Sequence, residues 1–320
     1  MRAQGYTTLI LLFLCTILKL RIVQSGCPKP HKIHPCSCLK SKSILECEDI
    51  THEDTLSTVM QVSKKHKVVG VELNAVVFRY IHHDAFDGTN IQSLVITNSS
   101  IISLSDTDYA FKGLEESLKV LKIKNCSYVN SWDWTQLRNL LKLEELEISN
   151  SELLELTEEF LKISNQPLVE LDFRENHIQW LPNNAFASFK KLERLKIGKN
   201  DISVLKRSMF PKPAKKLQTL GLSYNHIKEL PEDIFSDMPA LKFLYLESNP
   251  IRVLDERVFK PIWKQIKMFI MYQNLLICDC RLMWLTEMNH KLKFIHGTCS
   301  APPRLKGRNI LSLEPDELWC

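Results

Sequence analysis

The sequence is poor in glycine and lacks the short motifs that mark the commonest enzyme sites. Nine of its 320 residues are glycine, and no glycine-rich phosphate loop, GxSxG or HExxH is present. The run His82-His83-Asp84 falls in a return segment where polar residues are ordinary. These absences argue against nucleotide-dependent, serine-hydrolase and zinc-protease chemistry. We therefore expect a protein that is not an enzyme and that needs no cofactor and no metal.

Strong charge and long apolar runs are also missing. The formal net charge of +5 includes three positive charges from the first 25 residues, so the remainder carries +2. That is not the basic footprint of a nucleic-acid-binding protein. The apolar run Leu9–Leu18 is too short to cross a bilayer, which takes about 20 residues. Since Val23-Gln24-Ser25 follows it, we predict a signal peptide over residues 1–25, with a signal anchor as the alternative. The remainder should be secreted, with no membrane span and no lipid anchor.

What the sequence has is one pattern repeated along most of its length. The clearest copies are LQTLGLSYNHI at 217–227 and LKFLYLESNPI at 241–251. Both fit LxxLxLxxNxI followed by a longer return segment, the pattern of a leucine-rich repeat. Nine copies begin at Val68, Ile91, Leu118, Leu143, Leu168, Leu192, Leu217, Leu241 and Ile266. The sequence therefore predicts a curved, right-handed α/β leucine-rich-repeat solenoid with parallel strands on its concave face.

Each position of the repeat has a physical role. The LxL segment is a short strand whose leucines point inward. An Asn at the ninth position can satisfy turn backbone groups that the strand ladder does not reach. Because one repeat cannot bury its apolar face alone, neighbours stack into a continuous core. Repeats five to nine carry Asn176, Asn200, Asn225, Asn249 and Asn274, whereas the first four carry Val76, Ser99, Cys126 and Ser151. We therefore expect a less regular amino-terminal half.

Eight of the ten cysteines form two groups of four beside the repeats. Open ends of a solenoid expose core and need caps, and clustered cysteines in a secreted protein usually form disulfides. Four cysteines allow three pairings, and the sequence alone does not choose among them; zinc binding is the weaker alternative. We expect an amino-terminal cap at 26–67, repeats one to eight at 68–265, and repeat nine merging into a carboxy-terminal cap at 266–320.

The spacing Cx8CxCx8C before the repeats and the segment NLLICDCRLMWL at 274–285 resemble the flanking caps of extracellular leucine-rich-repeat proteins. One departure is Leu275-Leu276 in place of the usual proline and aromatic residue. The resemblance implies the disulfides Cys27–Cys38, Cys36–Cys47, Cys278–Cys299 and Cys280–Cys320. Over residues 27–320 the arrangement is also similar to arthropod secreted repeat proteins akin to the non-catalytic subunit of the Oplophorus luciferase. That similarity implies a separate catalytic subunit as a candidate partner.

Solvent-facing strand positions predict two candidate surfaces on the concave face. We call Glu145, Glu147, Glu170 and Asp172 the acidic band; basic residues precede and follow it in the sequence. It is either a solvated surface that the chain neutralises itself or a docking surface for a basic partner. A calcium site is disfavoured, because rigid strands seldom place six or more oxygens around one ion.

We call the second surface the aromatic patch; it comprises Tyr224, Phe243, Tyr245, Met268, Ile270 and Tyr272. These are outward positions of the last three repeats, so the repeat core does not account for them. Clustered aromatic and Met side chains on a surface are typical of interfaces. The alternative is that the carboxy-terminal cap folds over part of the patch, especially over repeat nine.

Two smaller features lie in the amino-terminal half. Asn98-Ser-Ser and Asn125-Cys-Ser are glycosylation sequons at the eighth position of adjacent repeats, and Asn98 is the better acceptor. Cys126 is the odd cysteine outside the predicted signal peptide. Because it occupies the ninth position, where Asn or Cys is usual, we predict a buried thiol rather than an intermolecular bridge.

These observations predict a secreted module that recognises an extracellular or cell-surface protein through its concave face. A non-catalytic stabilising subunit of a secreted enzyme and an extracellular-matrix component are the alternatives. The scaffold itself does not name a partner, because one fold serves many ligands.

Overall fold

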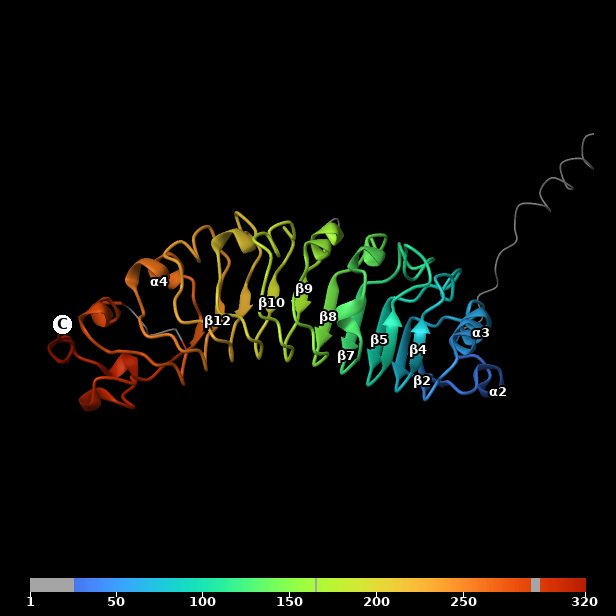
Figure 1. Cartoon of the computed structure of the whole chain (residues 1–320), viewed down its shortest axis with the longest axis horizontal. Coiled ribbons are helices and arrows are strands. Elements are labelled where there is room, and N and C mark those ends of the chain that lie inside the picture. The colour runs from blue at the N-terminus through green and yellow to red at the C-terminus, as the bar shows by residue number, and fades with distance from the viewer. Residues whose placement is uncertain (1–25, 165, 289–293) are drawn as a thin grey trace, which may run out of the picture.

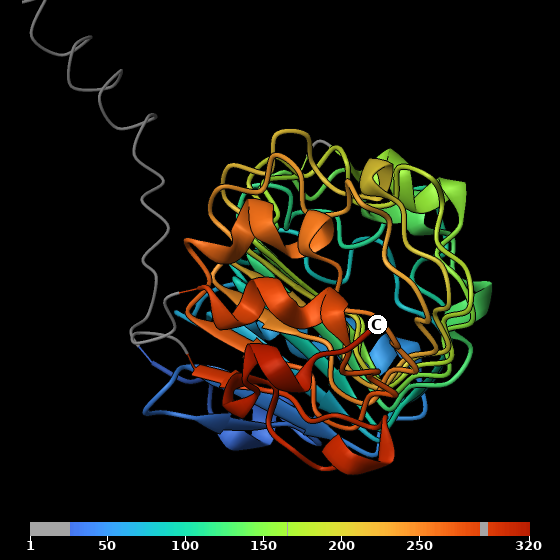
Figure 2. The ribbon, with the colours of Figure 1, turned by 90° about the vertical axis from the view of Figure 1, so that its left-hand side faces the viewer.

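The protein is an arch of stacked coils in a computed structural model that describes residues 26–164, 166–288 and 294–320. The parallel strands line the inner, concave side, and the return segments form the outer side (Figure 1). Seen end-on, successive coils lie behind one another (Figure 2). The predicted signal peptide lies outside the described residues. Among the described residues, no helix is long and apolar enough to cross a membrane.

The sheet confirms the predicted repeat spacing. Over the described residues it has twelve strands, in the order β1-β2-β3-β5-β7-β8-β9-β10-β11-β12-β13-β14. Their bounds are β1 (Ser37–Leu39), β2 (Ile44–Glu48), β3 (Gly70–Asn74), β5 (Ser93–Thr97), β7 (Val120–Lys124), β8 (Glu145–Ser149), β9 (Glu170–Asp172), β10 (Arg194–Lys196), β11 (Thr219–Gly221), β12 (Phe243–Tyr245), β13 (Met268–Ile270) and β14 (Phe294–His296). In this sheet, each strand from β3 to β13 begins at the third position of a predicted repeat.

Helical structure is confined to the ends and to the returns. The α-helices are α2 (Pro30–Ile33), α3 (Glu53–Ser63), α4 (Glu256–Trp263) and α5 (Met283–Thr286). Short 3-10 segments are η1 (Val129–Ser131), η2 (Trp134–Leu137), η3 (Glu158–Ile163), η4 (Arg207–Met209), η5 (Cys280–Leu282), η6 (Pro303–Leu305), η7 (Ile310–Ser312) and η8 (Pro315–Glu317). Two further strands, β4 (Val77–Tyr80) and β6 (Ser100–Ser103), form a separate parallel pair. Most of the outer side is therefore irregular rather than helical.

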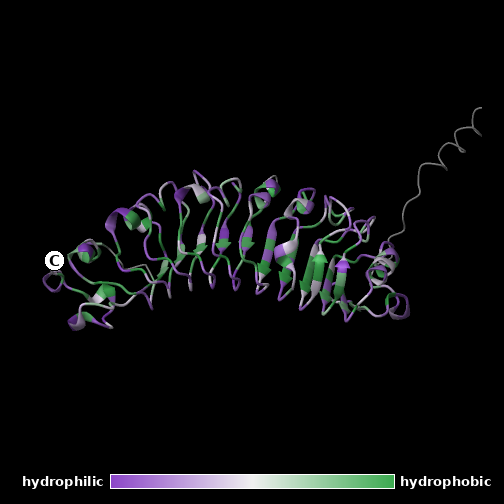
Figure 3. Cartoon of the chain, viewed as in Figure 1, coloured by the Kyte–Doolittle hydropathy of each residue, from purple (hydrophilic) through white to green (hydrophobic). Residues whose placement is uncertain are grey.

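One continuous apolar core runs between the sheet and the returns. Leu195, Leu220 and Leu244 are in register on adjacent strands and have no exposed surface. Phenylalanines from the returns contact one another across coils, as in the pair Phe235–Phe259 at a ring-centroid distance of 5.6 Å. Hydrophobic residues recur from coil to coil along the whole arch (Figure 3). Stacking of repeats therefore buries what one repeat alone would expose.

The ninth-position asparagines satisfy the turns as predicted. The Asn225 amide donates to the carbonyls of Ile197 at 3.0 Å and Leu222 at 2.9 Å, and its oxygen accepts from the Ile202 amide at 3.0 Å. In the amino-terminal half, smaller groups perform the same task. For example, the Ser151 hydroxyl accepts from the Cys126 amide at 3.1 Å. The predicted irregularity is therefore a change of side chain with little change in the backbone turn.

Disulfide-bonded caps close both ends of the core. The bonds are Cys27–Cys38, Cys36–Cys47, Cys278–Cys299 and Cys280–Cys320, as the family resemblance implied. At the amino-terminal end, β1 pairs antiparallel with β2, and β2 continues the parallel sheet into β3. At the other end, β14 adds a strand beside β13, and Trp284 of α5 packs edge-on against Trp263 at 5.0 Å. Since all eight of these cysteines are in disulfides, the zinc alternative is wrong.

Candidate functional site

The acidic band lies on β8 and β9 as predicted. Glu145 is in register with Glu170, and Glu147 is in register with Asp172. On the β7 side, Lys122 lies 3.5 Å from a Glu145 oxygen and 3.8 Å from a Glu147 oxygen. The two carboxylates of β8 are thus neutralised by the preceding strand.

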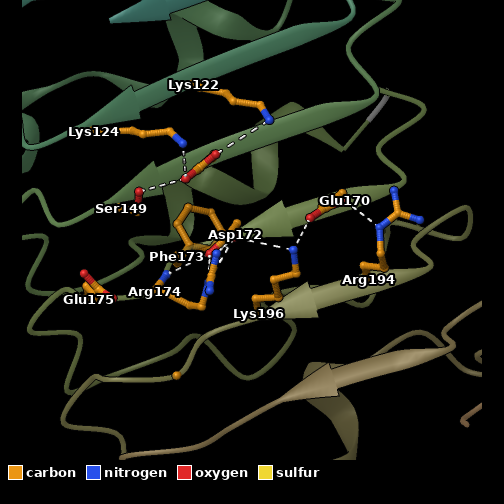
Figure 4. A network of polar contacts seen from close by, with 12 residues as sticks. Lys122, Lys124, Ser149, Glu170, Asp172, Phe173, Arg174, Glu175, Arg194 and Lys196 are labelled. Carbon is orange, nitrogen blue, oxygen red and sulfur yellow. Dashed lines mark hydrogen bonds and ion pairs between the residues drawn. The ribbon is translucent and has the colours of Figure 1, made fainter. Parts of the chain in front are cut away.

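Arg174, which follows β9, and two basic residues of β10 neutralise the other half of the acidic band (Figure 4). Arg194 and Lys196 both bond the Glu170 carboxylate, and the Arg174 guanidinium lies 2.7 Å from an Asp172 oxygen. Partial burial would raise the pKa of Glu170, but these two cations outweigh burial and lower it. These ion pairs agree with the alternative in which the chain neutralises the acidic band itself. Docking of a basic partner at the acidic band stays a prediction.

The aromatic patch is partly open and partly covered. Tyr224 is 45% exposed, and Phe243, Tyr245, Met268 and Tyr272 are half-buried. The Tyr245 hydroxyl lies 3.3 Å from the Met268 sulfur, so β12 and β13 present one joined surface. The patch therefore keeps four aromatic side chains, Tyr224, Phe243, Tyr245 and Tyr272, at least partly open to solvent.

The expectation that Ile270 is exposed was wrong. Ile270 is 8% exposed, because β14 pairs beside β13 and brings His296 into register with it. His296 also packs edge-on against the Tyr272 ring at 5.6 Å. The carboxy-terminal cap thus covers the far edge of the aromatic patch, as the alternative expected for repeat nine.

Beside the patch, the concave face is hollowed, a feature that the sequence reasoning missed. We call this site the concave hollow. It has a volume of about 340 Å³ and a floor of Gly198, Thr219, Gly221 and Ser223. Lys196 and Lys199 line one side, and Tyr224, Tyr245 and Glu247 line the other. The sequence offered only a weak signal for it, because small residues also occupy outward positions in other repeats, such as Ser93 and Thr97 in repeat two.

The charges of the concave hollow are unequally paired. Lys199 lies 2.7 Å from Glu175, and Lys196 is bound to Glu170. Glu247 differs, because its Oε2 atom is shielded from water and has no hydrogen-bond partner. Loss of hydration raises the pKa of the Tyr272 phenol, and the neighbouring Tyr224 and Glu247 raise it further. The hollow is thus lined by a carboxylate with one unsatisfied oxygen and by tyrosine side chains.

A second apolar surface also escaped the sequence reasoning. Exposed apolar side chains recur in the return segments of the first six repeats, just after the ninth position. They are Val77, Ile102, Tyr128, Leu154, Trp180 and Val204, each at least half exposed. We call them the return-segment row. Counting exposed apolar residues by repeat position would have found this surface, but nothing in the structure indicates what covers it.

Both sequon asparagines are exposed on adjacent turns. The Asn125 amide donates to the Asn98 oxygen at 2.7 Å, and the Asn98 amide donates to Asn74 at 2.8 Å. Ser127, the third residue of the second sequon, is also exposed. Cys126 is buried, as predicted, with its sulfur 3.3 Å from the Lys124 carbonyl. Burial raises the pKa of its thiol, which keeps it protonated.

Among the described residues, one group of three potential metal-ligating side chains lies in the carboxy-terminal cap. Asp279, Cys280 and Cys320 lie close enough to surround a metal ion. Cys280 and Cys320 are bonded to each other, however, so neither offers a thiolate ligand. This cluster therefore has no donor set suited to a metal.

Comparison with protein families agrees with the geometry. A leucine-rich-repeat model matches residues 190–251 and 215–264, and a model of the BspA-type leucine-rich-repeat region, with six copies, matches residues 79–210. A model of the leucine-rich-repeat C-terminal domain matches residues 298–320. Together with the parallel sheet and the terminal disulfides, these matches make the protein a leucine-rich-repeat solenoid. More particularly, it is one with a leucine-rich-repeat C-terminal cap.

Individual relatives are more distant. The chain is 40% identical over 48 residues to leucine-rich repeats and immunoglobulin-like domains protein 3 of mouse (Mus musculus) and of human (Homo sapiens). That match spans 14% of this chain and 4% of the length of those curated relatives.

Two solved structures share the fold. A chain from the octameric complex of latrophilin 3, Unc5D and FLRT2 superposes with a TM-score of 0.65 at 17% identity, covering 90% of this chain and 98% of that one. TLR13 in complex with a single-stranded RNA superposes with a TM-score of 0.56 at 20% identity, covering 69% of this chain and 34% of that one. At these identities the likeness concerns the fold.

Proposed function

We propose that this protein is a secreted recognition module that binds another extracellular protein through the carboxy-terminal half of its concave face. The observation that carries the proposal is the exposure of Tyr224 beside the half-buried Phe243 and Tyr245, which are aromatic side chains at outward positions of neighbouring repeats. Aromatic side chains on such a surface are the usual anchors of protein interfaces. The disulfides at both ends fit an oxidising, extracellular compartment.

The scaffold suits this role energetically. Each strand of the concave face is fixed by hydrogen bonds to its neighbours and by the leucine core behind it. The side chains of the aromatic patch are therefore ordered before a partner arrives, so little conformational entropy is lost on binding. The structural neighbour that forms a complex with latrophilin 3 and Unc5D supports such a use of the scaffold.

The experiment has two stages. First, the tagged protein is secreted from its native tissue, crosslinked gently, and its copurifying chains are identified by mass spectrometry. Recovery of a catalytic chain in stoichiometric amount would show that the protein is an accessory subunit of an enzyme, as the luciferase-like resemblance implies. Cell-surface chains would identify independent recognition, and chains that resist extraction would identify a matrix component.

Second, the purified partner is titrated against variants. Tyr245→Ala removes a central aromatic side chain, and a hot-spot residue of this kind contributes roughly 2 kcal/mol, or about 30-fold in Kd. Val204→Ala is the matched control, because it truncates an exposed apolar side chain of the return-segment row. An unchanged Kd for Tyr245→Ala, in a protein that is still folded, would refute the proposal.

A further inference from the structure

The concave hollow has a charge that the protein itself leaves unsatisfied. Glu247 occupies the seventh position of repeat eight, and its backbone carbonyl accepts from the Tyr224 amide at 2.8 Å. Its Oε2 atom is shielded from water and has no hydrogen-bond partner. An unmade hydrogen bond to a shielded polar group costs about 1–3 kcal/mol, and more for a charged group. A rotation of the Glu247 side chain that brings this oxygen to a cationic group in the hollow would recover that free energy.

The basic side chains of the concave hollow are already paired and do not compete for Glu247. Lys199 lies 2.7 Å from Glu175, and Arg174 lies 2.7 Å from Asp172. Lys196 bonds the Glu170 carboxylate, which lies on the side away from the aromatic patch. The charge left for a ligand is therefore negative, although the lining contains several cations.

Tyrosine side chains share the lining of the concave hollow with the Glu247 carboxylate. Tyr224 and Tyr245 line the concave hollow with Glu247, and the pKa of the Tyr272 phenol is raised by loss of hydration and, to a smaller extent, by Tyr224 and Glu247. A cation over a tyrosine ring gains roughly 0.5–2 kcal/mol. The volume of about 340 Å³ is at the lower end of ligand sites, which span about 300–1,000 Å³. It suits one long side chain rather than a peptide segment.

We propose that the concave hollow receives a basic side chain, arginine or lysine, which the partner protein inserts as an anchor. Glu247 is its counter-ion, Tyr224 and Tyr245 flank its aliphatic stem and cationic head, and the floor of small residues leaves room for its length. This inference rests on the proposed function, because it names the chemistry of the group that the bound protein presents.

Gly221 offers a way to fill the concave hollow without disturbing the fold. A Cβ atom built there would have no neighbour closer than 3.7 Å, the nearest being the Lys196 Cα. Its fifth-position side chain would point outward into the hollow. Gly198 is unsuitable, because a Cβ there would lie 2.9 Å from the Ser223 carbonyl oxygen. Gly221→Leu is therefore the blocking variant, and circular dichroism with thermal unfolding checks its fold.

The first test uses a hexa-arginine peptide as the probe, with hexa-glutamate as its opposite, titrated by calorimetry at low salt. Glu247→Gln, which keeps the shape and removes the charge, should weaken hexa-arginine binding at least about tenfold, a loss of about 1.4 kcal/mol. Gly221→Leu should weaken it by at least as much. Glu229→Gln is the control, because it removes the same charge at an exposed position outside the hollow. Equal losses in Glu229→Gln and Glu247→Gln, or preferential binding of hexa-glutamate, would overturn the inference.

The second test separates this inference from the proposed function. Phe243 belongs to the aromatic patch but does not line the concave hollow. The purified partner should bind more weakly to both Phe243→Ala and Glu247→Gln. If only Phe243→Ala weakens binding, recognition through the concave face stands and the anchor inference fails. If neither weakens binding, both fail.

Discussion

Replacing Asn225 by alanine tests why the repeats need an amide at the ninth position. Asn225 is buried, and its side chain makes three hydrogen bonds of 3.0 Å or less, to the Ile197 and Leu222 carbonyls and from the Ile202 amide. Alanine leaves the Ile202 amide without its partner and removes one of the two side-chain amide donors from each of the Ile197 and Leu222 carbonyls. At roughly 1 kcal/mol for each lost bond, Asn225→Ala should lower the free energy of unfolding by about 3 kcal/mol.

Urea unfolding followed by circular dichroism measures this loss, with the disulfides kept oxidised. Asn184→Ala is the control, because Asn184 is an exposed return-segment asparagine, and a surface change of this kind should stay within about 0.5 kcal/mol. Because solenoids can unfold in parts, the comparison requires that the slope with urea be the same in each variant. A loss in Asn225→Ala no larger than the control's would refute the reasoning that buried turn groups depend on the ninth-position amide.

Three further predictions concern charge, thiol reactivity and glycans. Ion pairs with Lys196 and Arg194 lower the pKa of Glu170, so its stabilising contribution is present above its ordinary pKa of 4.5 and is lost as the pH falls through its lower folded value. Urea midpoints should therefore fall more steeply with acidification in the wild type than in Glu170→Gln; parallel curves would contradict this. Cys126 should react with iodoacetamide only after denaturation, since it is buried and its thiol pKa is raised; rapid native alkylation seen by mass spectrometry would show an accessible thiol. Peptide:N-glycosidase F should reduce the mass of the secreted wild type but not of a form lacking both sequons, with Asn98 carrying the larger share; an unchanged wild-type mass would exclude glycans at both sites.

The fold could be predicted from the sequence because each repeat contains the residues that determine its own strand and turn. The spacing of Leu220 and Leu222 defines the strand, and Asn225 defines the turn that follows it, so strand register could be counted from the repeat alone. The disulfide pairing had a different basis. It came from the resemblance of the cysteine segments to known caps, because the sequence by itself allowed three pairings at each end.

The candidate site was only partly predictable, because it depends on contacts between distant segments. Ile270 occupies an outward position, but β14 reaches it from across the carboxy-terminal cap and buries it. The concave hollow also escaped, since Gly198 and Gly221 belong to different repeats and meet only when the strands align. The ion pairs of the acidic band could be foreseen from the register of its strands. That Glu247 has an oxygen without a hydrogen-bond partner could be seen only from the positions of the side chains.

The most direct test of the account is to map where the identified partner touches the solenoid. A photo-crosslinking residue is placed at Tyr224, on the concave face, and in a second protein at Val204, in the return-segment row; both positions are exposed. The account predicts crosslinks to the partner from position 224 and none from position 204. Crosslinks from position 204 alone, with both proteins folded and still binding the partner, would contradict recognition through the concave face.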